Sequence, residues 1–195
     1  MKRNIKHIIA EYQKKLLPVI SGYLKNKKVL DVGCGNGLNS FFFNKKCHSK
    51  ITLLDCEDIR DREVMSFPFI KSSVEKLPFK AASFDVVFLQ YVLHHLPRKI
   101  KITKVLNELK RVGKLVIIVE EIFTQKTNKQ KAKKFDLKIN KIIHPFSTMR
   151  IYKYYSDKEL NNYFNKVNLN IVKKRIIDKG NKEDGFLQRK VYILK

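Results

Sequence analysis

The residues best suited to binding a small molecule are three glycines, Gly33, Gly35 and Gly37, which directly follow the apolar run 29–32. A strand that turns into a helix beside a ligand favours glycine, because side chains would keep the backbone away from the ligand. The spacing departs from the dinucleotide fingerprint, which requires glycine where Leu38 stands. It also lacks the Lys-Ser or Lys-Thr pair of a phosphate-binding loop. The loop therefore disfavours NAD and ATP.

Two carboxylates near this loop indicate which cofactor remains. Asp31 precedes Gly33 by two positions, and a carboxylate attracts a cofactor that carries an ammonium and a sulfonium. A second apolar run, 51–54, ends in Asp55, about 20 residues after the glycines, where a doubly wound fold presents an acid to ribose hydroxyls. We therefore predict an S-adenosylmethionine site, with Asp31 at the ammonium and Asp55 at the ribose.

With these motifs the chain resembles the class I S-adenosylmethionine-dependent methyltransferases, particularly the type 11 small-molecule group. The resemblance covers residues 28–121 and includes the adenine-side segment 73–79 and the segment 90–96, which faces the methyl group in that family. It implies the following cofactor contacts: Asp31, Gly33, Cys34, Gly35, Asn36, Gly37, Asp55, Cys56, Ser73, Val74, Glu75 and Gln90.

One cofactor position departs from the family pattern. Ser73 stands where members usually carry an acid that accepts from the adenine amino group, and a hydroxyl accepts more weakly. Adenine selectivity is then expected to depend on backbone groups around Val74 and Glu75.

The residues expected near the acceptor include two adjacent histidines. A sulfonium methyl is already activated, so transfer requires mainly alignment, plus a base when the acceptor must lose a proton. His94 and His95 point about 100° apart on a helix, and we take His94 as the catalytic candidate. The alternative is that both histidines line the wall and proximity alone suffices. The acceptor contacts are predicted to be Tyr91, His95, His144 and Tyr152.

The apolar pattern predicts an α/β fold. Continuous rather than alternating apolar runs are typical of parallel strands that are covered on both faces. We expect a doubly wound, Rossmann-like, seven-stranded and mostly parallel sheet, with a C-terminal antiparallel strand and helices on both faces. The expected strands are 29–32, 51–54, 84–89, 115–119, 169–177 and 186–194, and the expected helices include 36–46, 101–111 and one that follows a capping box at 156–159.

The length of 195 residues predicts one methyltransferase domain, 1–195. Its parts are an N-terminal helical segment (1–26), a cofactor-binding core (27–121), a basic insertion or lid (122–155) and a C-terminal helix with strands (156–195). Pro18 is expected to divide the first segment into two short helices that lie over the opening of the cofactor site. The alternative is that this segment only packs on the domain and does not contact the ligand.

The charge is strongly basic, with 42 Lys and Arg against 18 Asp and Glu and a formal net charge of +24. Such a balance can indicate nucleic acid or an anionic membrane surface, but an excess of Lys over Arg is also typical of AT-rich genomes. The lysines of the insertion lie opposite an apolar stripe that begins with Phe135 and Ile139, as on a solvated lid or a helix at a membrane surface. No run could span a bilayer and no secretion signal is visible, so a cytoplasmic location is expected.

These observations together favour an enzyme that methylates a small-molecule or lipid-like acceptor at oxygen or carbon. A tRNA or rRNA methyltransferase is the second possibility, favoured by charge alone. A noncatalytic methyltransferase-fold subunit is the third, although such a subunit has no need of intact glycines. The three cysteines show neither disulfide nor metal-type spacing, and we expect no metal.

Overall fold

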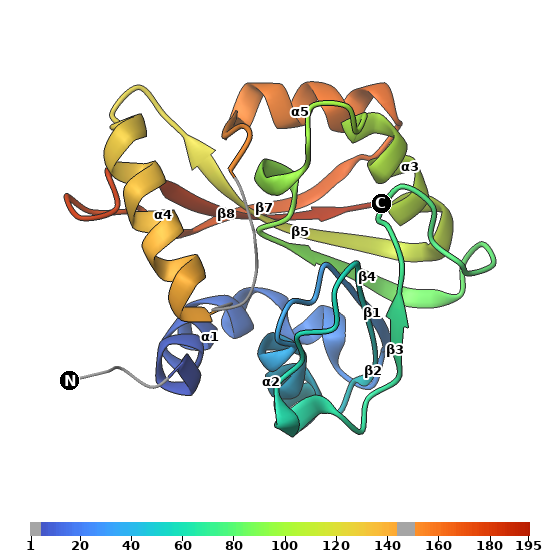
Figure 1. Cartoon of the computed structure of the whole chain (residues 1–195). Helices are drawn as coiled ribbons and strands as arrows, with labels where there is room; N and C mark the ends of the chain where they lie inside the picture. The colour runs from blue at the N-terminus through green and yellow to red at the C-terminus, as the bar shows by residue number, and fades with distance from the viewer. Residues whose placement is uncertain (1–4, 144–150) are drawn as a thin grey trace.

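The computed structural model describes residues 5–143 and 151–195, which are arranged around one eight-stranded sheet (Figure 1). The strand order is β3-β2-β1-β4-β5-β8-β7, and the short β6 pairs with β5 off this path. Strands β1 to β5 pair in parallel, whereas β8 runs antiparallel between β5 and β7. The strands are β1 (Lys28–Val32), β2 (Lys50–Asp55), β3 (Phe69–Lys71), β4 (Phe84–Gln90), β5 (Gly113–Phe123), β6 (Tyr155–Ser156), β7 (Ile171–Asp178) and β8 (Gln188–Leu194).

Helices cover both faces of this sheet, as the sequence predicts. Helices α1 and α2 pack against each other on one face, and α3 and α5 pack on the other (Figure 1). The helices are α1 (Ile5–Leu24), α2 (Leu38–Cys47), α3 (Ile102–Val112), α4 (Lys129–Ile143) and α5 (Asp157–Lys166), with short 3-10 turns at η1 (Arg62–Val64) and η2 (Leu93–His95). The predicted α/β, Rossmann-like fold class is confirmed, but the sheet has eight strands rather than the predicted seven, because the two-residue strand β6 adds to the edge of β5.

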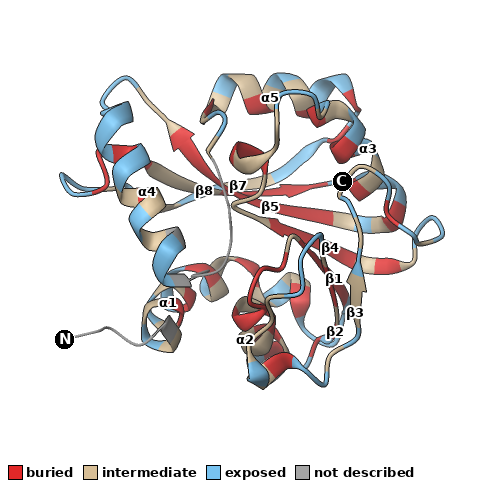
Figure 2. Cartoon of the chain, viewed as in Figure 1, coloured by how far each residue is buried: buried red, intermediate tan, exposed pale blue. Residues whose placement is uncertain are grey.

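The core consists of two apolar layers, one on each face of the sheet. The central strands are buried nearly throughout (Figure 2), which explains why they read as continuous apolar runs. Phe43 of α2 packs edge to face on Phe88 of β4, with ring centroids 4.8 Å apart, on the first face. On the second face, Phe164 of α5 meets Tyr192 of β8 at 5.3 Å.

The N-terminal segment differs from its prediction. We expected two short helices separated at Pro18, but α1 is one helix of 20 residues with Pro18 inside it. Proline removes one backbone donor from the helix interior. The apolar face of α1 compensates for this loss, because Leu16, Ile20 and Leu24 are fully buried against the sheet layer. Among the described residues, no helix is both long and apolar enough to cross a bilayer.

Helix α4 lies at one side of the sheet and carries the lysines of the predicted insertion (Figure 1). Ala132 and Asp136 are buried on its inner side, Phe135 and Ile139 face the cleft described below, and the lysines are exposed. This amphipathic arrangement is typical of a helix that packs by one stripe. The predicted capping box at the start of α5 is also present, with both reciprocal hydrogen bonds between Ser156 and Glu159.

Candidate active site

A cleft of about 1010 Å³ opens above the carboxyl ends of β1, β2, β4 and β5, between α1 and α4. Ligands of open α/β sheets bind at this edge, where the strand order reverses. Of the predicted site residues, the cleft is lined by Gly33, Cys34, Gly35, Asp55, Cys56, Ser73, Val74, Gln90, Tyr91, His95 and Tyr152. Five others in the described part of the chain do not line it: Asp31, Asn36, Gly37, Glu75 and His94. His144 lies outside the described residues.

The glycine loop forms one end of the cleft. Gly33, Gly35 and Gly37 all have positive φ, from 54° to 73°, a conformation that side chains disfavour. The loop is tied to β2, because the Gly33 amide donates to the Leu54 carbonyl at 2.8 Å and the Gly35 amide donates to Asp55 Oδ2 at 2.8 Å. Asp55, which is predicted to bind the ribose hydroxyls, therefore also holds the glycine loop in place.

Two loop positions serve packing rather than the cleft surface. A Cβ on Gly37 would lie 2.7 Å from Val64 Cγ2, so this glycine lets α2 approach η1. The Asn36 side chain accepts from the Leu38 amide at 3.1 Å and shapes the start of α2.

Asp31 lies beneath the loop and is only 3% exposed. Ser40 Oγ donates to Asp31 Oδ2 at 2.7 Å. Burial disfavours the charged carboxylate and raises the pKa of Asp31 to about 7, although the hydrogen bond from Ser40 opposes the shift. Its predicted contact with the cofactor ammonium stays a prediction, since the carboxylate sits behind the cleft surface.

The predicted adenine end of the cleft is formed by the segment that follows β3. Ser73 is exposed, and its hydroxyl accepts from the Glu75 amide at 3.2 Å. The Glu75 carboxylate instead lies 3.6 Å from Lys104 Nζ. Ser73 and Val74 line the cleft, whereas the Glu75 side chain points to α3.

The middle of the cleft is formed by the end of β4. Gln90 Oε1 is buried and has no hydrogen-bond partner among the described residues, so it can accept from a bound ligand. Tyr91 follows with φ of +55°, a conformation that is costly for a bulky residue and that clusters at functional sites. Its amide donates to the Val119 carbonyl at 2.9 Å, which holds the strained residue at the strand end.

Comparison with known proteins places this cleft in a family. Residues 30–116 match the family model described as a methyltransferase domain, type 11. Over these residues the chain is similar to the type 11 methyltransferase domain. This similarity supports the predicted enzyme class, a methyltransferase, and with it the predicted cofactor, S-adenosylmethionine.

Individual relatives of this methyltransferase domain cover different shares of the chain. A protein of Encephalitozoon cuniculi named as a methyltransferase is 32% identical over 101 residues, which are 50% of this chain and 47% of that protein. The tRNA U34 carboxymethyltransferase of Nautilia profundicola is 35% identical over 103 residues, 49% of this chain and 34% of that protein. The matches thus span half or less of the curated relatives.

A solved structure similar to the whole fold is that of the 1,6-didemethyltoxoflavin-N1-methyltransferase of Burkholderia thailandensis, with its acceptor and S-adenosylhomocysteine bound. It superimposes with a TM-score of 0.68 and 16% identity, covering 95% of this chain and 77% of that one. At this identity the likeness supports the fold alone.

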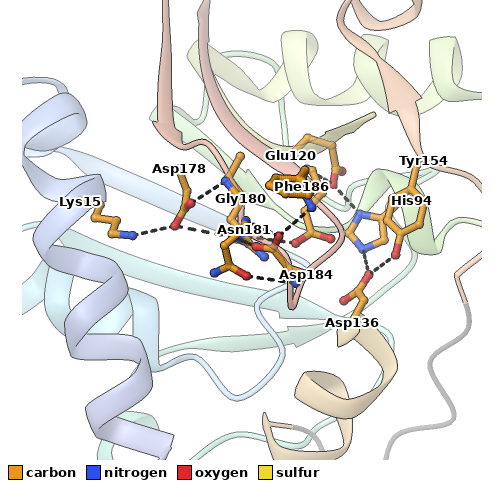
Figure 3. A network of polar contacts seen from close by, with 12 residues as sticks. Lys15, His94, Glu120, Asp136, Tyr154, Asp178, Gly180, Asn181, Asp184 and Phe186 are labelled. Carbon is orange, nitrogen blue, oxygen red and sulfur yellow. Dashed lines mark hydrogen bonds and ion pairs between the residues drawn. The ribbon is translucent and has the colours of Figure 1, made fainter. Parts of the chain in front are cut away.

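His94 of the methyltransferase domain occupies a different place from the one predicted. Its ring is 1% exposed and does not line the cleft. Nδ1 bonds to Glu120 Oε1 at 2.5 Å, and Nε2 lies 3.5 Å from Asp136 Oδ2 (Figure 3). Burial alone would lower the pKa of His94, but the Glu120 and Asp136 carboxylates outweigh it and raise that pKa to about 9. His94 is therefore placed behind the wall of the cleft, and its catalytic role stays a prediction.

The far end of the cleft contains charged residues that sequence reasoning missed. Arg189 of β8 lies between three carboxylates: its Nε is 3.2 Å from Glu121, and its Nη1 is 3.0 Å from Asp184 and 3.8 Å from Asp178. Glu121 Oε2 is buried without a hydrogen-bond partner among the described residues. Burial and the nearby Asp136 raise the pKa of Glu121 above its ordinary value, although Arg189 opposes the shift.

This charged cluster depends on strand pairing that the sequence does not display. Glu121 and Arg189 face each other because β8 pairs antiparallel with β5, a register that joins positions far apart in the chain. Lys15 of α1 reaches the same cluster, 2.7 Å from Asp178 (Figure 3). The one local signal was the acidic pair 120–121 at the end of a buried strand.

Proposed function

We propose that this protein transfers a methyl group from S-adenosylmethionine to a small-molecule or lipid-like acceptor, at oxygen or carbon. The observation that supports this most directly is the cleft, which runs from the glycine loop past Gln90 and Tyr91 to Glu121 and Arg189. A cleft of about 1010 Å³ is large enough for both a cofactor and a small acceptor.

The residues of the cleft fit the cofactor. The backbone of Gly33 and Gly35 lines the cleft and can lie against the methionine end, because glycine has no side chain of its own. Asp55 offers carboxylate oxygens to ribose hydroxyls, and the orphaned Gln90 oxygen offers a further acceptor. S-adenosylmethionine supplies an activated methyl when bound, so the protein need only align the acceptor with it. Asp31 acts from behind the loop by attracting the ammonium.

The charges that line the cleft favour a small molecule over a polyanion. Although the chain carries a net charge of +24, acidic side chains outnumber Lys and Arg on the cleft surface. The carboxylates that line it are Glu11, Asp55, Glu57, Glu121, Asp136, Asp178 and Asp184, against Lys15 and Arg189. A phosphate chain drawn into this cleft would be repelled.

The acceptor is expected to contact Tyr91, His95 and Tyr152, which line the middle of the cleft. Tyr152 is positioned by its amide, which donates to the His94 carbonyl at 2.9 Å. The predicted contact with His144 is kept as a proposal, although that residue lies outside the described part of the chain. Because the His94 side chain does not line the cleft, we expect the alignment of the acceptor with the methyl group to account for most of the rate enhancement.

A transfer assay tests this proposal. The protein is incubated with S-adenosylmethionine labelled at the methyl group, together with either a small-molecule extract or a total tRNA fraction. Label is expected in the small-molecule fraction with the wild type and with Glu183→Ala, an exposed carboxylate outside the cleft. Asp55→Asn should lower the rate at least about tenfold. Label confined to tRNA would overturn the small-molecule assignment.

The second candidate, a tRNA or rRNA methyltransferase, is favoured by the Nautilia relative and by the basic surface of α4. Specific binding would show a structure or sequence preference together with a steep loss of affinity at higher salt. Weak, uniform binding would indicate charge alone. Contact of α4 with an anionic membrane and a cytoplasmic location likewise stay predictions.

A further inference from the structure

Three side chains with metal-binding atoms converge where the wall of the cleft meets α4. His94 and His95 belong to η2, and Asp136 belongs to α4. One ligand atom from each of the three lies within 4.8 Å of the others. His95 and Asp136 also line the cleft, so the point between them is open to whatever the cleft binds.

The orientation of His94 is fixed by a carboxylate on its far side. Glu120 Oε1 bonds to Nδ1 at 2.5 Å, which directs Nε2 toward Asp136 (Figure 3). Glu120 is itself held, because its carboxylate accepts from the Leu93 and Glu121 amides. A histidine whose one nitrogen bonds to a carboxylate presents the other as a metal ligand in the usual way. Nε2 of His94 is buried without a hydrogen bond among the described residues but lies within ion-pair range of Asp136 Oδ2, so a metal ion binds there by displacing the proton that Nε2 carries.

The distances are compatible with a small divalent ion. Nitrogen and oxygen ligands stand about 2.1 Å from such an ion and hence about 3 to 3.4 Å from one another. The gap of 3.5 Å between His94 Nε2 and Asp136 Oδ2 is close to this separation. The third donor needs only a modest side-chain shift, since the set already spans no more than 4.8 Å.

We propose that His94, His95 and Asp136 bind a divalent first-row transition metal at the acceptor end of the cleft. Two imidazoles and one carboxylate favour Zn²⁺, Fe²⁺, Co²⁺ or Mn²⁺ over Mg²⁺ and Ca²⁺, which prefer oxygen ligands. Three protein ligands leave at least one position open. Because His95 and Asp136 line the cleft, an oxygen of an acceptor could bind at such a position. The inference goes beyond the proposed methyl transfer, and metal binding can be measured without it.

Metal titration of the tag-free, chelator-treated protein tests the site. Zn²⁺ binding is followed by calorimetry and Co²⁺ binding by visible absorption, in the wild type, His95→Gln and Asp136→Asn. His48→Asn is the matched control, because His48 is exposed at the end of α2 and asparagine tolerates its positive φ. Circular dichroism and S-adenosylmethionine binding verify that each variant is folded.

The expected result is one equivalent of metal bound with a Kd of about 10 μM or tighter. His95→Gln and Asp136→Asn should each weaken binding at least about tenfold, while His48→Asn leaves it unchanged. Absence of stoichiometric binding to the wild type would overturn the proposal. Equal binding by all four proteins would do the same, because it would indicate surface histidines rather than this cluster.

Discussion

Replacement of Asp31 by asparagine should change how stability depends on pH. Asp31 is buried beneath the glycine loop, and its pKa is raised to about 7 from its ordinary value near 4. Between these two pKa values the folded chain binds more protons than the unfolded chain, so this group lowers stability as pH rises. The amide of asparagine cannot ionise, so Asp31→Asn removes that decline.

The size of the effect follows from the shift. About three pKa units, at about 1.36 kcal/mol each, correspond to about 4 kcal/mol at pH 8, where the buried carboxylate is fully ionised. At pH 5 the same relation gives a loss of stability of about 1.5 kcal/mol from the raised pKa of Asp31. The stability of Asp31→Asn relative to the wild type should therefore increase by about 2 to 3 kcal/mol from pH 5 to pH 8. Any effect of the asparagine amide on stability that does not depend on pH is the same at pH 5 and pH 8, so it cancels in this comparison.

Urea unfolding at several pH values measures the difference directly. Asp85→Asn is a suitable control, because the Lys28 amide and the Lys114 ammonium lower the pKa of Asp85. The difference in unfolding free energy between Asp85→Asn and the wild type should not change with pH above about pH 5, since Asp85 is then ionised in both the folded and the unfolded chain. A flat difference for Asp31→Asn over the same range would refute the account of a buried, proton-binding Asp31.

Three further substitutions test separate parts of the structure. Gly33→Ala places a Cβ 2.5 Å from Val92 Cγ2 at a φ of +69°, and should cost about 1 to 3 kcal/mol in urea unfolding and weaken cofactor binding in calorimetry. Glu120→Ala leaves Nδ1 of the buried His94 without its partner and should cost about 3 to 5 kcal/mol, measured by thermal and urea unfolding. Ser156→Ala removes the cap of α5 and should cost only about 1 kcal/mol by the same assay.

Much of the fold was predictable because its signals are local. The strands 29–32, 51–54 and 84–89 were recognised from continuous apolar runs, and the start of α5 from its capping box. The strands β3 and β6 were missed, since three and two residues carry no periodic pattern. The helix α1 was wrongly divided at Pro18, because the burial of its apolar face outweighs one missing hydrogen bond.

The site was predictable only where it depends on adjacent residues. The glycine loop and Asp55 follow from the chain order β1-loop-α2-β2, which the sequence displays directly. Arg189 and Asp136 were missed, because they enter the cleft from β8 and α4 through long-range pairing and packing. The orientation of His94 depends on Glu120 in a neighbouring strand, so the sequence could name the histidine but not its direction.

Cofactor binding is the most direct test of the central claim, that the cleft above the glycine loop holds S-adenosylmethionine. Calorimetric titration compares the wild type, Asp55→Asn, which keeps an oxygen for the Gly35 amide, and the exposed control Glu183→Ala. We predict micromolar binding that Asp55→Asn weakens at least about tenfold, or about 1.4 kcal/mol, and that Glu183→Ala leaves unchanged. Folded wild-type protein that binds no cofactor, or binds it equally well without the Asp55 carboxylate, would contradict the account.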